Sequence, residues 1–228
     1  MVTESQTVAD IAVNVPGASR VFESHRIDYC CGGKRTLREA CDRVQVPVER
    51  VIAELDALGV DAPQKWTSLT TVVEHIIDEH HAYARTAMSQ LVPLANKVRR
   101  VHGERHPELA RVVELFDQIC EDLDPHMRAE EGSLFPAILQ MARPDCDPAR
   151  REALRLSIAV MQHEHEKVGR LLHMLREATS DYEVPPDACT SFRVLYRELE
   201  AFEHDLYEHI HLENNVLLPR AIAGQTTS

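Results

Sequence analysis

The sequence predicts an all-α protein, in which a small helical N-terminal domain precedes an antiparallel four-helix bundle. From Ser68 onward, apolar residues recur every three or four positions over long stretches, which is the period of an amphipathic helix. Loops containing Gly or Pro divide these stretches into helices over about 69–100, 108–142, 149–178 and 187–218. Because the connections are short, neighbouring helices are expected to run antiparallel.

The first part of the chain has a different pattern. Short helical segments are interrupted by Pro16, Gly32-Gly33 and Pro47, and Asp61-Ala62-Pro63 has the composition of a linker. The predicted boundaries are 1–60 for the small domain, 61–67 for the linker, 68–224 for the bundle and 225–228 for a tail.

Composition excludes several classes of protein. The 228 residues carry a net charge of -12 without a dense basic block, which argues against nucleic acid or an anionic membrane surface as partner. No apolar run has the length of a membrane span, and the N-terminus lacks the basic region of a signal peptide. Six cysteines without framework spacing indicate reduced thiols, so we expect a cytoplasmic protein.

Two segments repeat the same motif. His126 is followed four residues later by Glu130, and His209 is followed four residues later by Glu213. In both segments a proline comes six residues after the glutamate. Positions i and i+4 share one face of a helix, so each segment presents an imidazole and a carboxylate together. The duplicated pair is the donor set that two non-haem iron ions would require.

Each predicted bundle helix carries a histidine in its apolar stripe. In the third helix the stripe selects His165 over His163, whereas in the first helix periodicity does not decide between His80 and His81. Burying these imidazoles and both carboxylates without a metal would cost several kcal/mol per group. The stripes are Val73, Ile77, His81, Ala84, Met88, Leu91; Val112, Phe116, Ile119, Leu123, His126, Glu130, Leu134, Ala137; Leu154, Ile158, Met161, His165, Val168, Leu172, Leu175; and Phe192, Leu195, Leu199, Phe202, Leu206, His209, Glu213, Val216.

The types of donor indicate the metal. Four histidines and two carboxylates without a thiolate argue against structural zinc and iron–sulfur ligation, and two glutamates could bridge two ions. Iron is favoured, and a di-manganese centre stays open. His102 is disfavoured as a ligand because it precedes a helix along which His126 lies roughly 27 Å away, at about 1.5 Å per residue.

Two motifs together resemble one family. Tyr29-Cys30-Cys31-Gly32-Gly33 and the segment from His209 to Leu217, which contains Glu213-Asn214-Asn215, are similar to the repair-of-iron-centres (RIC, ScdA-type) family over about residues 8–223. The resemblance implies a hemerythrin-like bundle holding two non-haem iron ions, with oxo and carboxylate bridges. The ligands it implies, with His81 chosen over His80, are His81, His126, Glu130, His165, His209 and Glu213. The segment Val101-His102-Gly103 also resembles a family feature, which counts against excluding His102.

The vicinal cysteines are the second site of interest. Cys30 and Cys31 stand beside Gly32-Gly33 and Lys34-Arg35, so flexibility and positive charge are expected to lower a thiol pKa. We expect these thiols to accept or pass on iron, or to act in redox chemistry. Glu164 is expected to support the metal site from outside. The other cysteines, expected to be structural, are Cys41, Cys120, Cys146 and Cys189.

The resemblance implies repair of iron–sulfur clusters damaged by nitrosative or oxidative stress, by donation of iron. Two alternatives stay open: a di-iron enzyme that reduces NO or a peroxide, and a binding module that senses O₂ or NO. The expected partners are damaged iron–sulfur proteins and the small ligands NO or O₂, and the chain is expected to be a monomer or a homodimer.

Overall fold

The computed structural model describes residues 1–58, 66–141 and 148–223. The predicted tail 225–228, most of the predicted linker 61–67, and Cys146 lie outside these residues. The described residues form helices and no strand, apart from an isolated bridge between Thr7 and Thr36. The all-α prediction is therefore confirmed. No helix within the described ranges is both long and apolar enough to cross a membrane.

The chain divides into two compact units. The first comprises residues 1–73, 139–151 and 208–228, and the second comprises residues 74–138 and 152–207.

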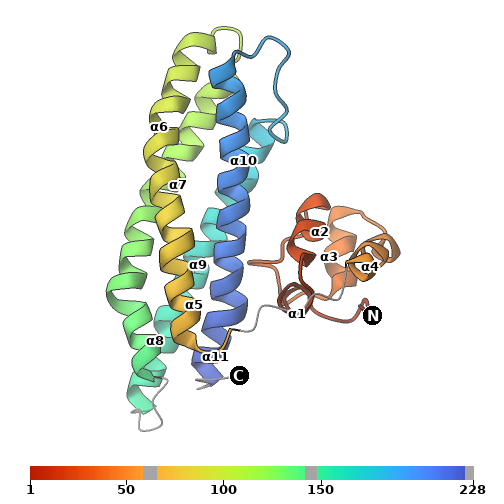
Figure 1. Cartoon of the computed structure of the whole chain (residues 1–228), viewed down its shortest axis with the longest axis vertical. Coiled ribbons are helices and arrows are strands. Elements are labelled where there is room, and N and C mark those ends of the chain that lie inside the picture. Colours follow the sequence, from red (N-terminus) through yellow and green to blue (C-terminus); the bar gives the residue numbers. More distant parts are fainter. Residues whose placement is uncertain (59–65, 142–147, 224–228) are drawn as a thin grey trace. The chain divides into compact units, whose positions relative to one another are not determined.

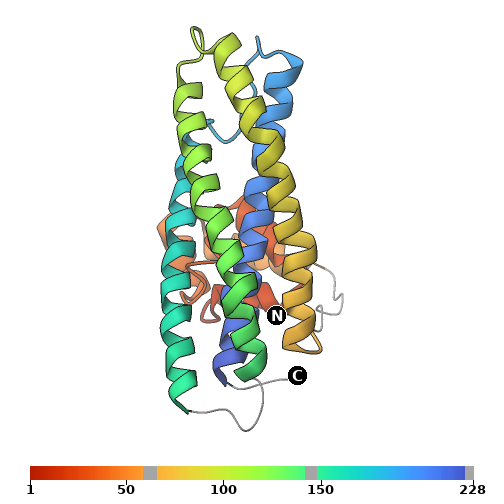
Figure 2. The same ribbon diagram turned by 90° about the vertical axis from the view of Figure 1, so that its left-hand side faces the viewer.

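The second unit is the bundle (Figures 1 and 2). Its four long helices lie side by side, and the chain direction alternates from one to the next. They belong to α6 (Ala82–His102), α7 (Glu108–Ala129), α9 (Pro148–Ala178) and α10 (Thr190–His211). The four predicted helices are thus present.

Three of these helices continue through a π-helical turn into a further helical segment. The first sequence is α5 (Leu69–His75), η1 (Ile76–His81) and α6; the second is α7, η2 (Glu130–Leu134) and α8 (Phe135–Met141); the third is α10, η3 (Leu212–Leu217) and α11 (Leu218–Ala223). Only α9 lacks such a turn among the four described bundle helices.

The π-helical turns shift the buried face. All seven predicted stripe residues of α9 are buried, from Leu154 to Leu175. Where a π turn intervenes, two predictions are wrong by one residue: Ile76 is buried instead of Ile77, and Ile138 is buried instead of Ala137. A π turn places one more residue in the turn, so the positions after it no longer follow the 3.6-residue period.

The N-terminal helices belong to the first unit and pack around their own core. They are α1 (Val8–Asn14), α2 (Ala18–Ser24), α3 (Leu37–Val44) and α4 (Val48–Ala57). Thr36 begins α3 with a capping box, in which its side chain accepts from the Glu39 N–H and the Glu39 side chain accepts from the Thr36 N–H. Phe22, Leu37 and Val51 are completely buried. The loop between α2 and α3 carries the vicinal cysteines.

Candidate metal centre

Four of the predicted ligands meet within the second unit. The Glu130 carboxylate lies with one oxygen 3.1 Å from His126 Nε2 and 3.9 Å from His165 Nε2. Its other oxygen lies 3.3 Å from His81 Nε2. All four side chains are buried, and Glu130 and His81 are completely so. The two carboxylate oxygens therefore face different histidines, as a carboxylate that bridges two cations would.

Acidic side chains orient two of these imidazoles from outside. Glu131 Oε1 lies 2.7 Å from His81 Nδ1, and Glu164 Oε2 lies 2.8 Å from His126 Nδ1. A carboxylate at Nδ1 holds the proton there, so the Nε2 lone pair points toward the interior. Glu164 thus occupies the outer position expected from the sequence.

Glu131 has a second partner that the sequence reading missed. Arg85 lies 2.8 Å from the same Glu131 oxygen that His81 contacts. Partial burial raises the pKa of Glu131, but the hydrogen bonds with His81 and Arg85 outweigh it, and the pKa lies below its ordinary value. Glu131 is therefore held as an anion against the imidazole. Its position next to Glu130 gave the only signal, because no stripe contains it.

The remaining predicted pair lies at the end of the fourth bundle helix. His209 Nε2 is 3.1 Å from Glu213 Oε1, and both side chains are buried. His209 stands near the end of α10, and Glu213 stands in η3, so the i, i+4 contact spans the junction.

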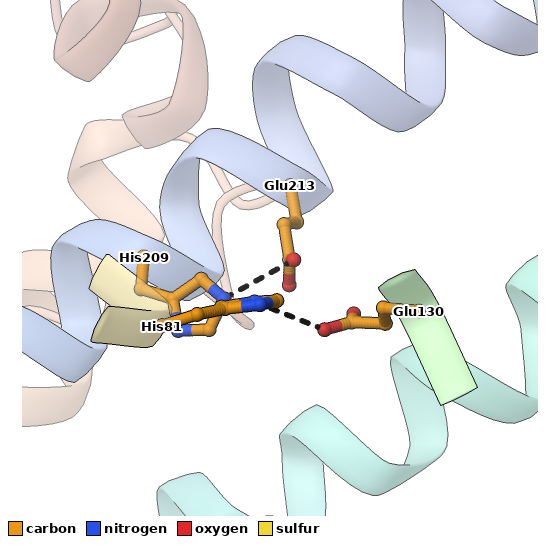
Figure 3. A group of neighbouring side chains, drawn as sticks. All are labelled: His81, Glu130, His209 and Glu213. Atoms are coloured by element: carbon orange, nitrogen blue, oxygen red, sulfur yellow. Dashed lines mark hydrogen bonds and ion pairs between the residues drawn. The ribbon is translucent and has the colours of Figure 1, made fainter. Parts of the chain in front are cut away.

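Two overlapping groups bring the predicted ligands together. In each, one donor atom per residue lies within 4.8 Å of the others. The first, drawn in Figure 3, contains His81, Glu130, His209 and Glu213. The second contains His126, Glu130, His165 and Glu213. Both groups share the two carboxylates, and each has its own two histidines.

This donor set fits a pair of metal ions. An apolar interior does not stabilise the negative charge of two completely buried carboxylates, whereas two bound cations would neutralise it. Nitrogen and carboxylate oxygen donors without sulfur suit iron or manganese. The π-helical turns η1, η2 and η3 contain His81, Glu130 and Glu213 respectively, and such turns are frequent at functional sites.

Other histidines have partners elsewhere. His80 is buried and lies 2.9 Å from Asp205 through Nδ1, while His163 is largely exposed. His102 Nε2 lies 3.1 Å from Cys189 Sγ near the end of α6, and it belongs to neither group of ligands. His211 is buried, and the centre of its ring lies 5.3 Å from that of the Tyr29 ring, with the two planes tilted by 59°.

The vicinal cysteines differ from one expectation. Both are free thiols, with their sulfur atoms 3.6 Å apart. Cys30 is buried, and its pKa lies well above that of an ordinary thiol, because the hydrogen bond with Cys31, burial and the Asp28 carboxylate all disfavour its thiolate. The expectation of a lowered thiol pKa is therefore wrong for Cys30. The basic residues that follow it do not outweigh these effects.

The comparisons with known proteins agree with this fold and site. Residues 72–221 match the hemerythrin HHE cation binding domain, and the chain belongs to that family. Residues 4–59 match the ScdA_N domain, a domain of unknown function (DUF542).

Full-length relatives carry a more particular name. The iron-sulfur cluster repair protein YtfE of Escherichia coli O157:H7 is 37% identical over 229 residues, covering 99% of this chain and 100% of that protein. The protein of the same name from Shigella boydii serotype 4 (strain Sb227) is 36% identical over the same shares. The resemblance to the repair-of-iron-centres family is thereby confirmed.

Proposed function

We propose that this protein repairs iron–sulfur clusters damaged by nitrosative or oxidative stress, and that it does so by supplying iron. The iron is held as a non-haem pair by His81, His126, His165 and His209, with Glu130 and Glu213 as the shared carboxylates. The observation that carries the proposal is the sharing of two buried carboxylates by two groups that have two histidines each. The names of the full-length relatives support the repair role.

The donor count favours release of the iron. Each group offers four protein donor residues, two of them shared, whereas iron commonly takes up to six ligands. The outer carboxylates Glu131 and Glu164 keep two imidazoles oriented, so the chain can rebind a metal ion after losing one. Damaged iron–sulfur proteins in the cytoplasm would receive the iron. This chain would act as a monomer or as a homodimer.

A repair assay tests the proposal directly. Iron-loaded protein is added anaerobically, as the sole iron source, to an iron–sulfur protein whose clusters have been destroyed by NO. Return of cluster absorbance and of the recipient's activity is expected, together with a matching loss of iron from the donor. Equal recovery with metal-free protein would overturn the proposal.

Glu130→Gln provides the matched variant. It removes the shared negative charge while keeping nearly the same shape, so we expect loss of bound iron and of repair. Glu114→Gln, at an exposed position of α7, the helix that precedes η2, should behave like the wild type. A Glu130→Gln protein that keeps both its iron and its repair rate would remove this carboxylate from the centre.

The same open positions favour a second candidate function. A metal ion with four protein donors leaves room for a small ligand, so reduction of NO or a peroxide, or sensing of O₂ or NO, would use the same centre. NO consumption with a reductant present, at rates that exceed iron loss, would favour the enzyme. Release of a bound partner protein on exposure to NO would favour the sensor.

A further inference from the structure

The loop between α2 and α3 gathers three potential donors outside the bundle centre. Cys30 Sγ lies 3.6 Å from Cys31 Sγ and 3.5 Å from Asp28 Oδ1. One donor atom from each of the three residues lies within 4.8 Å of the others. We propose that Asp28, Cys30 and Cys31 form a second, exchangeable site for a divalent transition-metal ion such as Fe²⁺.

The distances match those around a tetrahedral ion. With metal–sulfur bonds of about 2.3 Å, two thiolates on one ion lie about 3.8 Å apart. With a metal–oxygen bond of about 2.1 Å, sulfur and carboxylate oxygen lie about 3.6 Å apart. The observed separations of 3.6 Å and 3.5 Å differ little from these values. Both separations are thus compatible with one ion held by these residues.

Charge also favours a cation. Asp28, Cys30 and Cys31 bring three groups that are anionic when ionised within 4.8 Å of one another. A divalent ion replaces the two thiol protons, which pass to solvent, and its charge compensates the thiolates and the carboxylate. No electron is transferred in this step.

The glycines after the cysteines have a packing reason. A Cβ on Gly32 would stand 2.8 Å from the Asp28 carboxylate, and a Cβ on Gly33 would stand 2.8 Å from both Ala9 Cβ and the Tyr29 carbonyl oxygen. At Gly33 the neighbours include backbone and leave no room for a side chain, whereas at Gly32 they are the ends of the Arg35 and Asp28 side chains, which can shift. Gly33 therefore allows the loop to pack closely against Ala9 and the Tyr29 carbonyl.

Side chains of η3 fix the loop through its backbone. Asn214 Nδ2 donates to the Cys30 carbonyl at 3.1 Å, and Asn215 Nδ2 donates to the Tyr29 carbonyl at 3.0 Å. The Cys31 N–H donates to Asp28 Oδ1 at 2.9 Å. These bonds hold the three donors in place before any metal binds, which reduces the entropic cost of binding.

Exposure makes the site suited to exchange rather than storage. Cys30 is buried, Cys31 is half-buried and Asp28 is exposed. The fourth tetrahedral position therefore opens toward solvent, where a thiol or carboxylate of another protein can enter. Metal binding here does not depend on the function proposed above; only the later fate of the metal does.

Cobalt binding tests the site in the full-length, iron-loaded, reduced protein under anaerobic conditions. Titration with Co²⁺ should give thiolate-to-cobalt charge-transfer absorption that saturates at one equivalent, while the two thiols lose their reactivity toward a thiol reagent. The histidine and carboxylate centre cannot produce this absorption. Absence of the band from protein with fully reduced thiols would overturn the proposal.

Variants assign the band to its residues. Cys31→Ser should abolish it, and Asp28→Asn should weaken Co²⁺ binding at least about tenfold. Cys189→Ser, at an exposed thiol, and Asp42→Asn, at an exposed carboxylate of α3, should leave it unchanged. Far-ultraviolet circular dichroism confirms that each variant is folded. A band that survives in folded Cys31→Ser protein, or is indifferent to Asp28→Asn, would contradict the three-donor site.

The bundle centre is monitored in the same samples. Cys31→Ser should keep its iron content, and Glu130→Gln should keep the cobalt band while losing iron. Failure of the second site is therefore distinguished from failure of the proposed function.

Discussion

The Glu130 carboxylate connects two of the histidines in the candidate metal centre. It is completely buried, and its oxygens lie 3.1 Å from His126 Nε2 and 3.3 Å from His81 Nε2. Each of these imidazoles has a carboxylate at its other nitrogen, from Glu164 and Glu131 respectively. The alternation of acid, imidazole and acid sets which nitrogen faces inward.

Glu131→Gln should weaken iron binding without unfolding the protein. The amide can still accept the hydrogen bond from His81, but it lacks the charge that increases the basicity of the imidazole and pairs with Arg85. Loss of such an outer partner typically costs about 10- to 100-fold in metal affinity. Competition with a calibrated chelator measures this change.

The control is Glu121→Gln, at an exposed position of the preceding helix α7. Its iron affinity should equal that of the wild type. If Glu131→Gln also equals the wild type, the Glu131 carboxylate does not tune His81.

At the scale of elements, apolar periodicity predicted the four bundle helices and five of the six residues in the two ligand groups, and the family resemblance was needed to choose His81 over His80. It succeeded fully in α9, which is α-helical throughout. It failed by one position at Ile76 and at Ile138, because a π turn adds a residue that no simple period anticipates. The outer contacts of Glu131 join residues far apart in the sequence, and the high pKa of Cys30 depends on burial and on the folding of its own loop, so periodicity could give neither.

The pairing of α9 with α10 contains a buried ion pair that the stripes also missed. Arg176 lies 2.7 Å from Glu203 Oε2 and donates through Nε to Oε1 at 3.2 Å. Glu203 is completely buried, and burial raises its pKa even though Arg176 lowers it. The arginine therefore compensates a charge that the interior would otherwise reject.

Arg176→Met should destabilise the protein by roughly 3 kcal/mol at pH 7, at the low end for breaking a buried pair because Arg176 is partly exposed. Glu203 has a raised folded pKa, so the folded state binds its proton more readily than the unfolded state. The deficit should shrink as the pH falls toward 4.5, the ordinary pKa of a glutamate. Urea unfolding across this range measures it.

Arg197→Met is the matched control, because Arg197 is largely exposed on α10. It should change the free energy of unfolding by no more than about 0.5 kcal/mol. Replacing Glu203 with Gln in the Arg176→Met protein should recover much of the loss. A deficit that is independent of pH would point to lost packing rather than to an unpaired carboxylate.

At the scale of the whole molecule, the chain combines two kinds of donor set. One consists of the buried imidazoles and carboxylates proposed to hold iron away from water, and the other consists of the thiols and the carboxylate proposed as an exchange site on a loop of the first unit. A protein that supplies iron needs both retention and a route for exchange, and the net charge of -12 keeps cations near its surface.

Iron bound at the bundle centre should increase the thermal stability of the protein. Metal ions that bind only the folded state stabilise it by mass action, so anaerobic removal of iron with a chelator should lower the Tm. In the metal-free protein, Glu130 and Glu213 stay buried without the cations that compensate them, and their charge then opposes folding.

The double variant Glu130→Gln/Glu213→Gln separates these two effects. Burying a neutral amide costs less than burying a carboxylate, so its Tm should equal or exceed that of metal-free wild-type protein. Added iron should raise the Tm of the wild type but not that of the double variant. Thermal unfolding followed by circular dichroism, with Glu114→Gln/Glu198→Gln as a control of equal charge, measures both. A metal-free double variant less stable than the metal-free wild type would show that these carboxylates serve packing. If its Tm instead equals or exceeds that of the metal-free wild type, the two negative charges in the core serve iron binding and not folding.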